Sequence, residues 1–159
     1  MKFQDDIKIV LDQEIVEDLK RCINKASPYE ACGLIFGDIR EININEEGFQ
    51  YHYIGQLFEC IKSTKKSTVA FLIDNIEELN KIYQTAAKKY NMRLISIFHS
   101  HPGGNYPSGV DTKNMKYLED FKAFKNLIWT IMNAENYDLN GFIYFNNEFW
   151  QIAIEIEKM

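Results

Sequence analysis

The residues best suited to chemistry lie in one short stretch, where two histidines and an aspartate flank a turn rich in glycine and proline. His99 and His101 stand two residues apart at the end of an apolar run, and Asp111 follows the turn. Side chains two apart on a strand point to the same face, so both imidazoles can face one point. The stretch therefore predicts two nitrogen donors and one carboxylate around a common centre.

This set of donors suits zinc. Catalytic zinc sites use three protein ligands and keep a fourth position open for water, whose pKa the metal lowers to about 7. Each half of the pattern also has a simpler explanation. The histidines could be satisfied or partly exposed strand residues, and Ser108 with Asp111 could form a helix cap in which the hydroxyl accepts a bond from a backbone amide. Their occurrence together in one stretch favours the metal site.

The same stretch resembles the signature of the JAMM (MPN-plus, JAB) zinc metallopeptidases, in their single-domain prokaryotic form. The matching segments are His99-Ser100-His101-Pro102 and Ser108-Gly109-Val110-Asp111. Upstream, the segment from Glu30 to Gly37 is similar to the glutamate-bearing strand of that family. The resemblance covers at least residues 27 to 111.

The resemblance implies a role for each residue of the site. Zn²⁺ would be held by His99, His101 and Asp111. Glu30 would act as general base and then general acid, and Ser108 would donate a hydrogen bond to the developing oxyanion.

One departure from the family lies in the turn before Ser108. Five residues separate Pro102 from Ser108, whereas the family commonly has about six, and a tighter turn at Gly103-Gly104 can absorb the difference because glycine reaches conformations that other residues avoid.

By resemblance, the chain is expected to hydrolyse peptide or isopeptide bonds after a C-terminal Gly-Gly. The expected substrate is a ubiquitin-like protein, its conjugate or a sulfur-carrier protein, bound by β-augmentation. A dipeptidase or a phage-type peptidoglycan peptidase stays open. Two alternatives belong to other classes: a catalytically inactive MPN-type scaffold or binding module, and a hydrolase related to the zinc deaminases. Deaminases carry a Pro-Cys-x-x-Cys signature, which this sequence lacks.

Hydrophobic periodicity predicts the strands and helices on which these residues lie. Ile7 to Leu11 predicts a strand, and Asp12 can cap a following helix with one apolar stripe. Glu30 to Phe36 predicts the strand that begins with the proposed base. Ile42 to Asn45 and Gln50 to Ile54 predict a hairpin.

In the second half of the chain, Val69 to Ile73 predicts a strand, and Asp74 with Glu77 a capping box before a helix that reaches Tyr90. Leu94 to Phe98 predicts a strand buried on both faces. A helix is expected from about Ser108 to Phe124, and two or three strands from Asn126 to Ile156. The mixture indicates an α/β (α+β) fold with a mixed sheet flanked by helices, and the resemblance implies an MPN, cytidine-deaminase-like architecture.

Composition narrows the class of protein. A chain of 159 residues with 46% hydrophobic and 26% charged residues is expected to form a single domain, here residues 1–159, and not a coiled coil or a disordered tail. The net charge of −5 argues against a nucleic-acid partner. The absence of a long apolar segment argues against a membrane protein, and the early acidic residues against a signal peptide. A cytoplasmic location is expected, and the oligomeric state, with a homodimer among the options, stays open.

The remaining distinctive residues receive structural interpretations. Cys22, Cys32 and Cys60 are odd in number and widely spaced, which predicts small buried hydrophobic residues and no disulfide framework or zinc finger. A cysteine nucleophile paired with histidine is the alternative. His52 is expected to face solvent on a strand. The aromatic residues Trp129, Tyr144, Phe145 and Trp150 are expected in the core or in a dimer interface.

Overall fold

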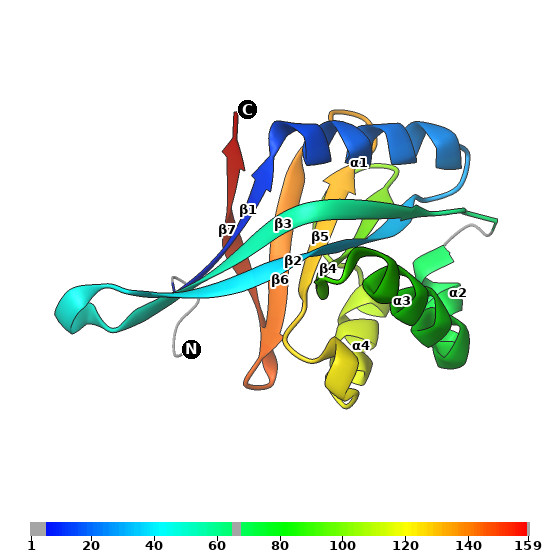
Figure 1. Ribbon diagram of the computed structural model, residues 1–159. Coiled ribbons are helices and arrows are strands. Elements are labelled where there is room, and N and C mark those ends of the chain that lie inside the picture. Colours follow the sequence, from blue (N-terminus) through cyan, green and yellow to red (C-terminus); the bar gives the residue numbers. More distant parts are fainter. Residues whose placement is uncertain (1–5, 65–67, 159) are drawn as a thin grey trace.

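The fold is taken from a computed structural model, which describes residues 6–64 and 68–158. Figure 1 labels its helices and strands. The strands are β1 (Ile7–Asp12), β2 (Cys32–Asn43), β3 (Phe49–Ile61), β4 (Arg93–His101), β5 (Ile128–Asn133), β6 (Leu139–Phe145) and β7 (Glu148–Glu157). The helices are α1 (Gln13–Ala26), α2 (Thr68–Asp74), α3 (Ile76–Tyr90) and α4 (Gly109–Leu118), with short 3-10 turns η2 (Asn45–Glu47) and η3 (Lys122–Phe124).

The strands form one mixed sheet that closes on itself. Their order is β1-β3-β2-β4-β5-β6-β7, and β7 pairs back to β1. β1 runs parallel to both β3 and β7, and β4 runs parallel to β5, whereas the other neighbours are antiparallel. The predicted mixed sheet flanked by helices is confirmed. Its closure into a barrel was not predicted, because strand order depends on pairings between distant segments.

The helices cover two sides of the strands, with α1 on one side and α2, α3 and α4 on the other (Figure 1). As predicted, β1 leads into α1, and the Asp12 carboxylate accepts a hydrogen bond of 2.8 Å from the backbone amide of Ile15. The apolar stripe of α1 is buried against the strands. Its members are Ile15, Val16, Leu19, Cys22, Ile23 and Ala26.

The second core lies between the strands and the helices α2, α3 and α4. Here the strand predicted over Val69 to Ile73 is wrong, since these residues belong to α2. Val69, Leu72 and Ile73 are buried in this core, and their spacing of three and four residues places them on one helical face. The β-branched composition suggested a strand, but the helical spacing decides the structure.

Several predicted boundaries shift by a few residues. β2 begins at Cys32 and not at Glu30, and it continues to Asn43, where the turn before β3 completes the predicted hairpin. The capping box predicted at Asp74 and Glu77 is wrong: the N-cap of α3 is Asn75, whose side chain makes no capping bond.

The C-terminal third of the chain also departs from its predicted boundaries. α4 ends at Leu118, short of the predicted Phe124, because the chain turns there and buries Phe124 from η3. The C-terminal strands are confirmed as β5, β6 and β7.

The cysteine prediction is wrong. Cys22 on α1 forms a disulfide with Cys60 near the end of β3, and Cys60 is exposed. The two residues are 38 positions apart in sequence, so only the folded arrangement of α1 against β3 reveals the pair. Cys32 is a free and buried thiol, as expected.

Three of the aromatic residues singled out in the sequence lie in or against the two cores. Trp129 is buried in the second core, while Tyr144 and Trp150 pack against the cores from partly buried positions. His52 is only partly exposed on β3 and lies 3.1 Å from the Gln50 side chain. Among the described residues, no helix is long and apolar enough to cross a membrane.

Candidate metal centre

The two histidines lie at the end of β4, a strand enclosed by neighbours on both edges. β2 pairs with β4 on one edge and β5 on the other. The His99 side chain is fully buried, and the His101 side chain is 14% exposed. The His101 carbonyl accepts a bond of 2.9 Å from the amide of Ala134, which holds the strand end in place. Both imidazoles therefore stand on a strand that is paired on both edges, and His101 is the more exposed of the two.

Asp111 reaches the same point from the first turn of α4. Ser108 is the N-cap of this helix, and its hydroxyl accepts a bond of 3.1 Å from the Asp111 amide. In return, Asp111 Oδ2 accepts a bond of 2.9 Å from the Ser108 amide. This reciprocal capping box fixes the carboxylate at the helix N-terminus. The helix cap therefore does not exclude a metal site at this point, because the oxygen that closes the cap also faces the histidines.

The three donor atoms form a tight triangle. Asp111 Oδ2 lies 2.9 Å from His101 Nε2 and 3.2 Å from His99 Nε2, and the two Nε2 atoms are 3.1 Å apart. Ligand atoms of a tetrahedral zinc ion, with bonds of about 2.0–2.1 Å, are spaced by roughly 3.3 Å. The observed separations come close to that spacing. Two imidazoles and one carboxylate are also the chemical set that zinc prefers.

The polar contacts of His99 are all made through one ring nitrogen. Its Nε2 faces His101 and Asp111, whereas its Nδ1 is buried and has no hydrogen-bond partner in the part of the chain that the structure describes. The ring contacts the edge of Trp129, at a centroid distance of 6.2 Å. Among the described residues, the polar partners of the His99 side chain therefore all belong to the triangle.

The electrostatics of the triangle follow from its hydrogen bonds. Burial opposes ionisation of Asp111, but the bonds from His101 and His99 outweigh it and hold the pKa of this carboxyl well below its usual range. The bond to Asp111 raises the pKa of His101, although burial acts in the opposite direction. The carboxylate therefore carries its negative charge throughout the physiological range, which suits a cation ligand.

Glu30 lies beside this triangle because the start of β2 is tied to β4. Cys32 pairs with His99, and the two chains run antiparallel. Continuing this register by two residues places Glu30 opposite His101. Ala31 donates its amide to the Ser100 hydroxyl at 2.9 Å, and its carbonyl accepts the Ser100 amide at 3.0 Å. The negative charge of Glu30 also contributes to the raised pKa of His101. Glu30 thus neighbours the three donors.

Ser100 is a residue whose contribution the sequence did not suggest. It stands between the two histidines, is 2% exposed, and joins the segment that precedes β2 and carries Glu30 to the strand that carries both histidines. Its position between His99 and His101 on the opposite face of the strand was a signal that could have indicated this role.

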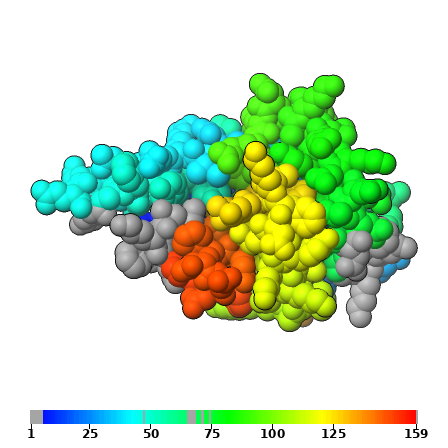
Figure 2. Space-filling view, turned by 90° about the horizontal axis from the view of Figure 1, so that it is seen from below, coloured from blue at the N-terminus to red at the C-terminus, as the bar shows by residue number. Residues whose placement is uncertain are grey.

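The turn before α4 takes the compact form expected for its reduced length. Gly104 has a φ of +87°, a conformation that favours glycine, and Ser108 takes its place as N-cap. Figure 2 shows α4 on this face of the molecule, between α3 and the β6–β7 turn. The shorter turn therefore does not displace Ser108 from the start of the helix.

A cavity of about 260 Å³ lies on the side of β4 that faces α1, and its lining includes Tyr29, Glu30, Ser100 and Pro102 but none of the three donors. The alternative of a cysteine nucleophile gains no support, since burial raises the pKa of the Cys32 thiol to about 12.

The chain was compared with known proteins. The family model of prokaryotic homologs of the JAB domain matches residues 12–151. A protein of Desulfitobacterium hafniense with a known solution structure is similar in fold, with a TM-score of 0.67 and 21% identity, over 95% of this chain and 94% of that one. A JAB1/MPN domain protein from Archaeoglobus fulgidus has a TM-score of 0.55 and 12% identity, over 94% of this chain and 98% of that one. No curated protein matches the sequence.

The family model spans most of the chain and includes Glu30, His99, His101, Ser108 and Asp111. Both structural relatives align along nearly their whole length. The resemblance seen in the sequence is therefore confirmed at the level of the family: the chain belongs to the prokaryotic homologs of the JAB domain.

Proposed function

We propose that the protein is a zinc-dependent metallopeptidase that hydrolyses peptide or isopeptide bonds. The observation that carries this proposal is the convergence of His99 Nε2, His101 Nε2 and Asp111 Oδ2 within 2.9–3.2 Å of one another, beside Glu30, in a chain of the JAB family. We expect the protein to work in the cytoplasm.

When bound, zinc would polarise the scissile carbonyl as a Lewis acid and make water acidic enough to attack near neutral pH. His99, His101 and Asp111 would hold it. The Glu30 carboxylate accepts a proton from the attacking water and returns it to the leaving amine. The backbone of the next residue, Ala31, is hydrogen-bonded to Ser100, and this holds the segment that carries Glu30 beside β4.

Ser108 stands at the N-terminus of α4, next to the Asp111 carboxylate. Its hydroxyl oxygen accepts the Asp111 amide, and its own O–H can donate to the oxyanion that develops on the scissile carbonyl. The positive end of the α4 dipole supports the same negative charge. Ser108 thus serves the helix cap and the reaction together.

The surface beside the centre supports a protein or peptide substrate. Tyr106 and Val110 flank Ser108 in sequence and are 61% and 59% exposed. Large apolar side chains so placed offer contact area to a bound chain. Following the family resemblance, we propose a substrate with a C-terminal Gly-Gly, whose lack of side chains would let it enter beside the buried histidines. A ubiquitin-like or sulfur-carrier protein, free or conjugated, carries such a tail.

The proposal is tested by incubating the purified protein with linear fusions and isopeptide conjugates of Gly-Gly-tailed ubiquitin-like proteins. We expect cleavage after Gly-Gly, loss of cleavage with a chelator, and recovery on addition of zinc. Tails ending in Ala-Ala serve as the matched control for specificity.

The same assay separates the competing functions. An inactive scaffold or binding module would bind a tailed partner without cutting it at any zinc concentration. A deaminase-related hydrolase would release ammonia from nucleosides and leave the fusions intact, and a dipeptidase would cut short peptides in preference to fusions.

A further inference from the structure

We infer that the Cys22–Cys60 disulfide is a redox-sensitive latch on the backbone that carries Glu30. Thiol–disulfide exchange with an anionic thiol would open the latch and lower turnover while zinc stays bound. Its effect on turnover rests on the proposed function, whereas its effect on the backbone does not.

The disulfide joins two elements that meet beside the centre. Cys22 lies on the buried face of α1 and is 1% exposed. Cys60 is exposed and precedes the last residue of β3. The crosslink therefore ties the end of β3 to α1 with one sulfur in the core and one sulfur within reach of solvent.

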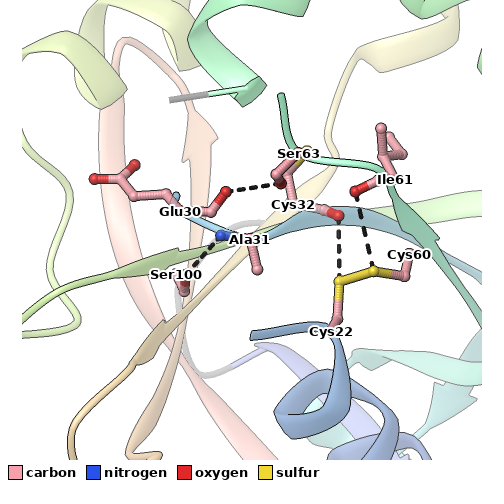
Figure 3. Close-up of a disulfide and its surroundings, with 8 residues drawn as sticks. All are labelled: Cys22, Glu30, Ala31, Cys32, Cys60, Ile61, Ser63 and Ser100. Atoms are coloured by element: carbon pink, nitrogen blue, oxygen red, sulfur yellow. Dashed lines mark hydrogen bonds between the residues drawn. A yellow bond between two sulfur atoms is a disulfide. The ribbon is translucent and has the colours of Figure 1, made fainter. Parts of the chain in front are cut away.

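The end of β3 in turn contacts the backbone that leads from Glu30 to Cys32. Ile61 pairs with Cys32 in the sheet, and the Ser63 hydroxyl donates a bond of 2.9 Å to the Glu30 carbonyl. Cys22 Sγ itself lies 3.6 Å from the Cys32 carbonyl oxygen. Figure 3 shows the contacts of Ser63 with Glu30 and of Cys22 with Cys32, with the Glu30 carboxylate pointing away from the sulfur atoms.

The opposite side of the segment is held by β4. Ala31 exchanges two hydrogen bonds with Ser100, the residue between the two histidines. The backbone around Glu30 is thus held on two sides, by β4 and by the end of β3, which the disulfide attaches to α1. Breaking the crosslink would weaken the contacts with β3 and leave those with β4. The proposed ligands on β4 and α4 would keep their positions.

A cavity gives a thiol access to the bond. It has a volume of about 270 Å³, and its lining includes Cys22, Cys60, Lys25 and Lys62. The two ammonium groups would attract a thiol that carries carboxylates. They would also favour the thiolate form that attacks. The site therefore suits a small acidic thiol such as glutathione.

The thiol–disulfide exchange consists of two successive displacements. A thiolate attacks Cys60 Sγ, the bond between the protein sulfurs breaks, and Cys22 leaves as a thiolate that takes up a proton. A second thiolate then attacks the external sulfur of the mixed disulfide and releases Cys60. Overall, two external thiols are oxidised to one disulfide, and the protein disulfide is reduced to two thiols.

The expected cytoplasmic location strengthens the inference. In that compartment, disulfides are rare and are usually transient, catalytic or redox-sensing. If the redox state of the crosslink alters the contacts that hold the Glu30 backbone, turnover would depend on the ratio of thiols to disulfides in the cell.

The test compares the zinc-loaded protein before and after treatment with reduced glutathione. Alkylation and mass spectrometry count the thiols, and metal analysis follows zinc. On reduction we expect kcat on the Gly-Gly fusion to fall about ten-fold, within the roughly 10²-fold that a displacement of 1 Å can cost. Zinc content should stay constant. Cys60→Ser should show the lowered kcat at once and should not respond to glutathione.

Amide hydrogen exchange provides a readout that does not depend on turnover. Reduction should accelerate exchange at Ala31 and Cys32 more than at the amides of β5, which should change only by the amount that the lost crosslink lowers global stability. Unchanged exchange at Ala31 would overturn the latch, as would a uniform acceleration along the whole chain, which marks a simple staple. Absence of cleavage in both redox states would instead contradict the proposed function, and exchange alone would then decide the latch.

Discussion

The substitution Asp111→Asn separates the two duties that one carboxylate oxygen performs. Asp111 Oδ2 accepts the Ser108 amide and faces both histidine Nε2 atoms. An asparagine oxygen can still accept the Ser108 amide, so the cap of α4 should persist. The amide carries no charge and is a poor zinc ligand. The variant should therefore keep its fold and lose its metal.

The magnitude can be worked out from linkage. At a zinc concentration of 100 times the dissociation constant, the wild-type protein gains about 2.7 kcal/mol of stability. For a domain of this size, that gain should raise the Tm by roughly 5–10 °C. If the substitution weakens zinc binding by about 100-fold, the same zinc concentration adds only about 0.4 kcal/mol, which corresponds to roughly 1–2 °C.

Differential scanning calorimetry with and without zinc measures this difference, and Ser108→Ala is the matched control. That variant removes the hydroxyl that accepts the Asp111 amide and leaves the carboxylate. It should lose about 0.5–2 kcal/mol of stability and retain the rise in Tm on addition of zinc. An Asp111→Asn protein with the full zinc-induced rise, or a Ser108→Ala protein without one, would refute this reasoning.

Three further predictions concern other parts of the account. Glu30→Gln should keep zinc by metal analysis and lose roughly 10²–10⁴-fold in kcat; an unchanged kcat with zinc bound would remove Glu30 from the mechanism. The Asp111 bond raises the pKa of His101. In zinc-free protein the stability that this pair contributes should therefore be present below pH about 6.5 and be lost as pH rises through the raised pKa. Zinc affinity should increase over the same interval. Calorimetric titrations at several pH values measure both changes. Cys60→Ser opens a crosslink between residues 38 apart and should lower the free energy of unfolding in urea by about 4 kcal/mol on chain-entropy grounds; no loss would mean that the crosslink does not restrain the unfolded chain.

The candidate site could be predicted from the sequence largely because its ligands are local. His99 and His101 share a strand, and strand geometry alone sends both side chains to one face. Asp111 follows a turn whose glycine and proline residues bring the chain back. Glu30 came from resemblance and not from geometry. Its pairing with β4 through Ala31 and Ser100 depends on contacts that sequence patterns do not encode.

The features that could not be predicted depend on long-range pairing or on competing local signals. The disulfide joins Cys22 to Cys60 only because α1 packs beside the end of β3. The return of β7 to β1 closes the sheet between the two ends of the chain. In α2, Val69 and Ile73 favour a strand by composition, and burial against the second core selects the helix.

X-ray absorption spectroscopy at the zinc edge of the zinc-loaded protein tests whether the metal binds at His99, His101 and Asp111. We expect one zinc per chain with only nitrogen and oxygen neighbours at about 2.0–2.2 Å, two of them imidazoles. A shell of sulfur at about 2.3 Å, or coordination without imidazole, would contradict this expectation, because the metal would then lie away from His99, His101 and Asp111.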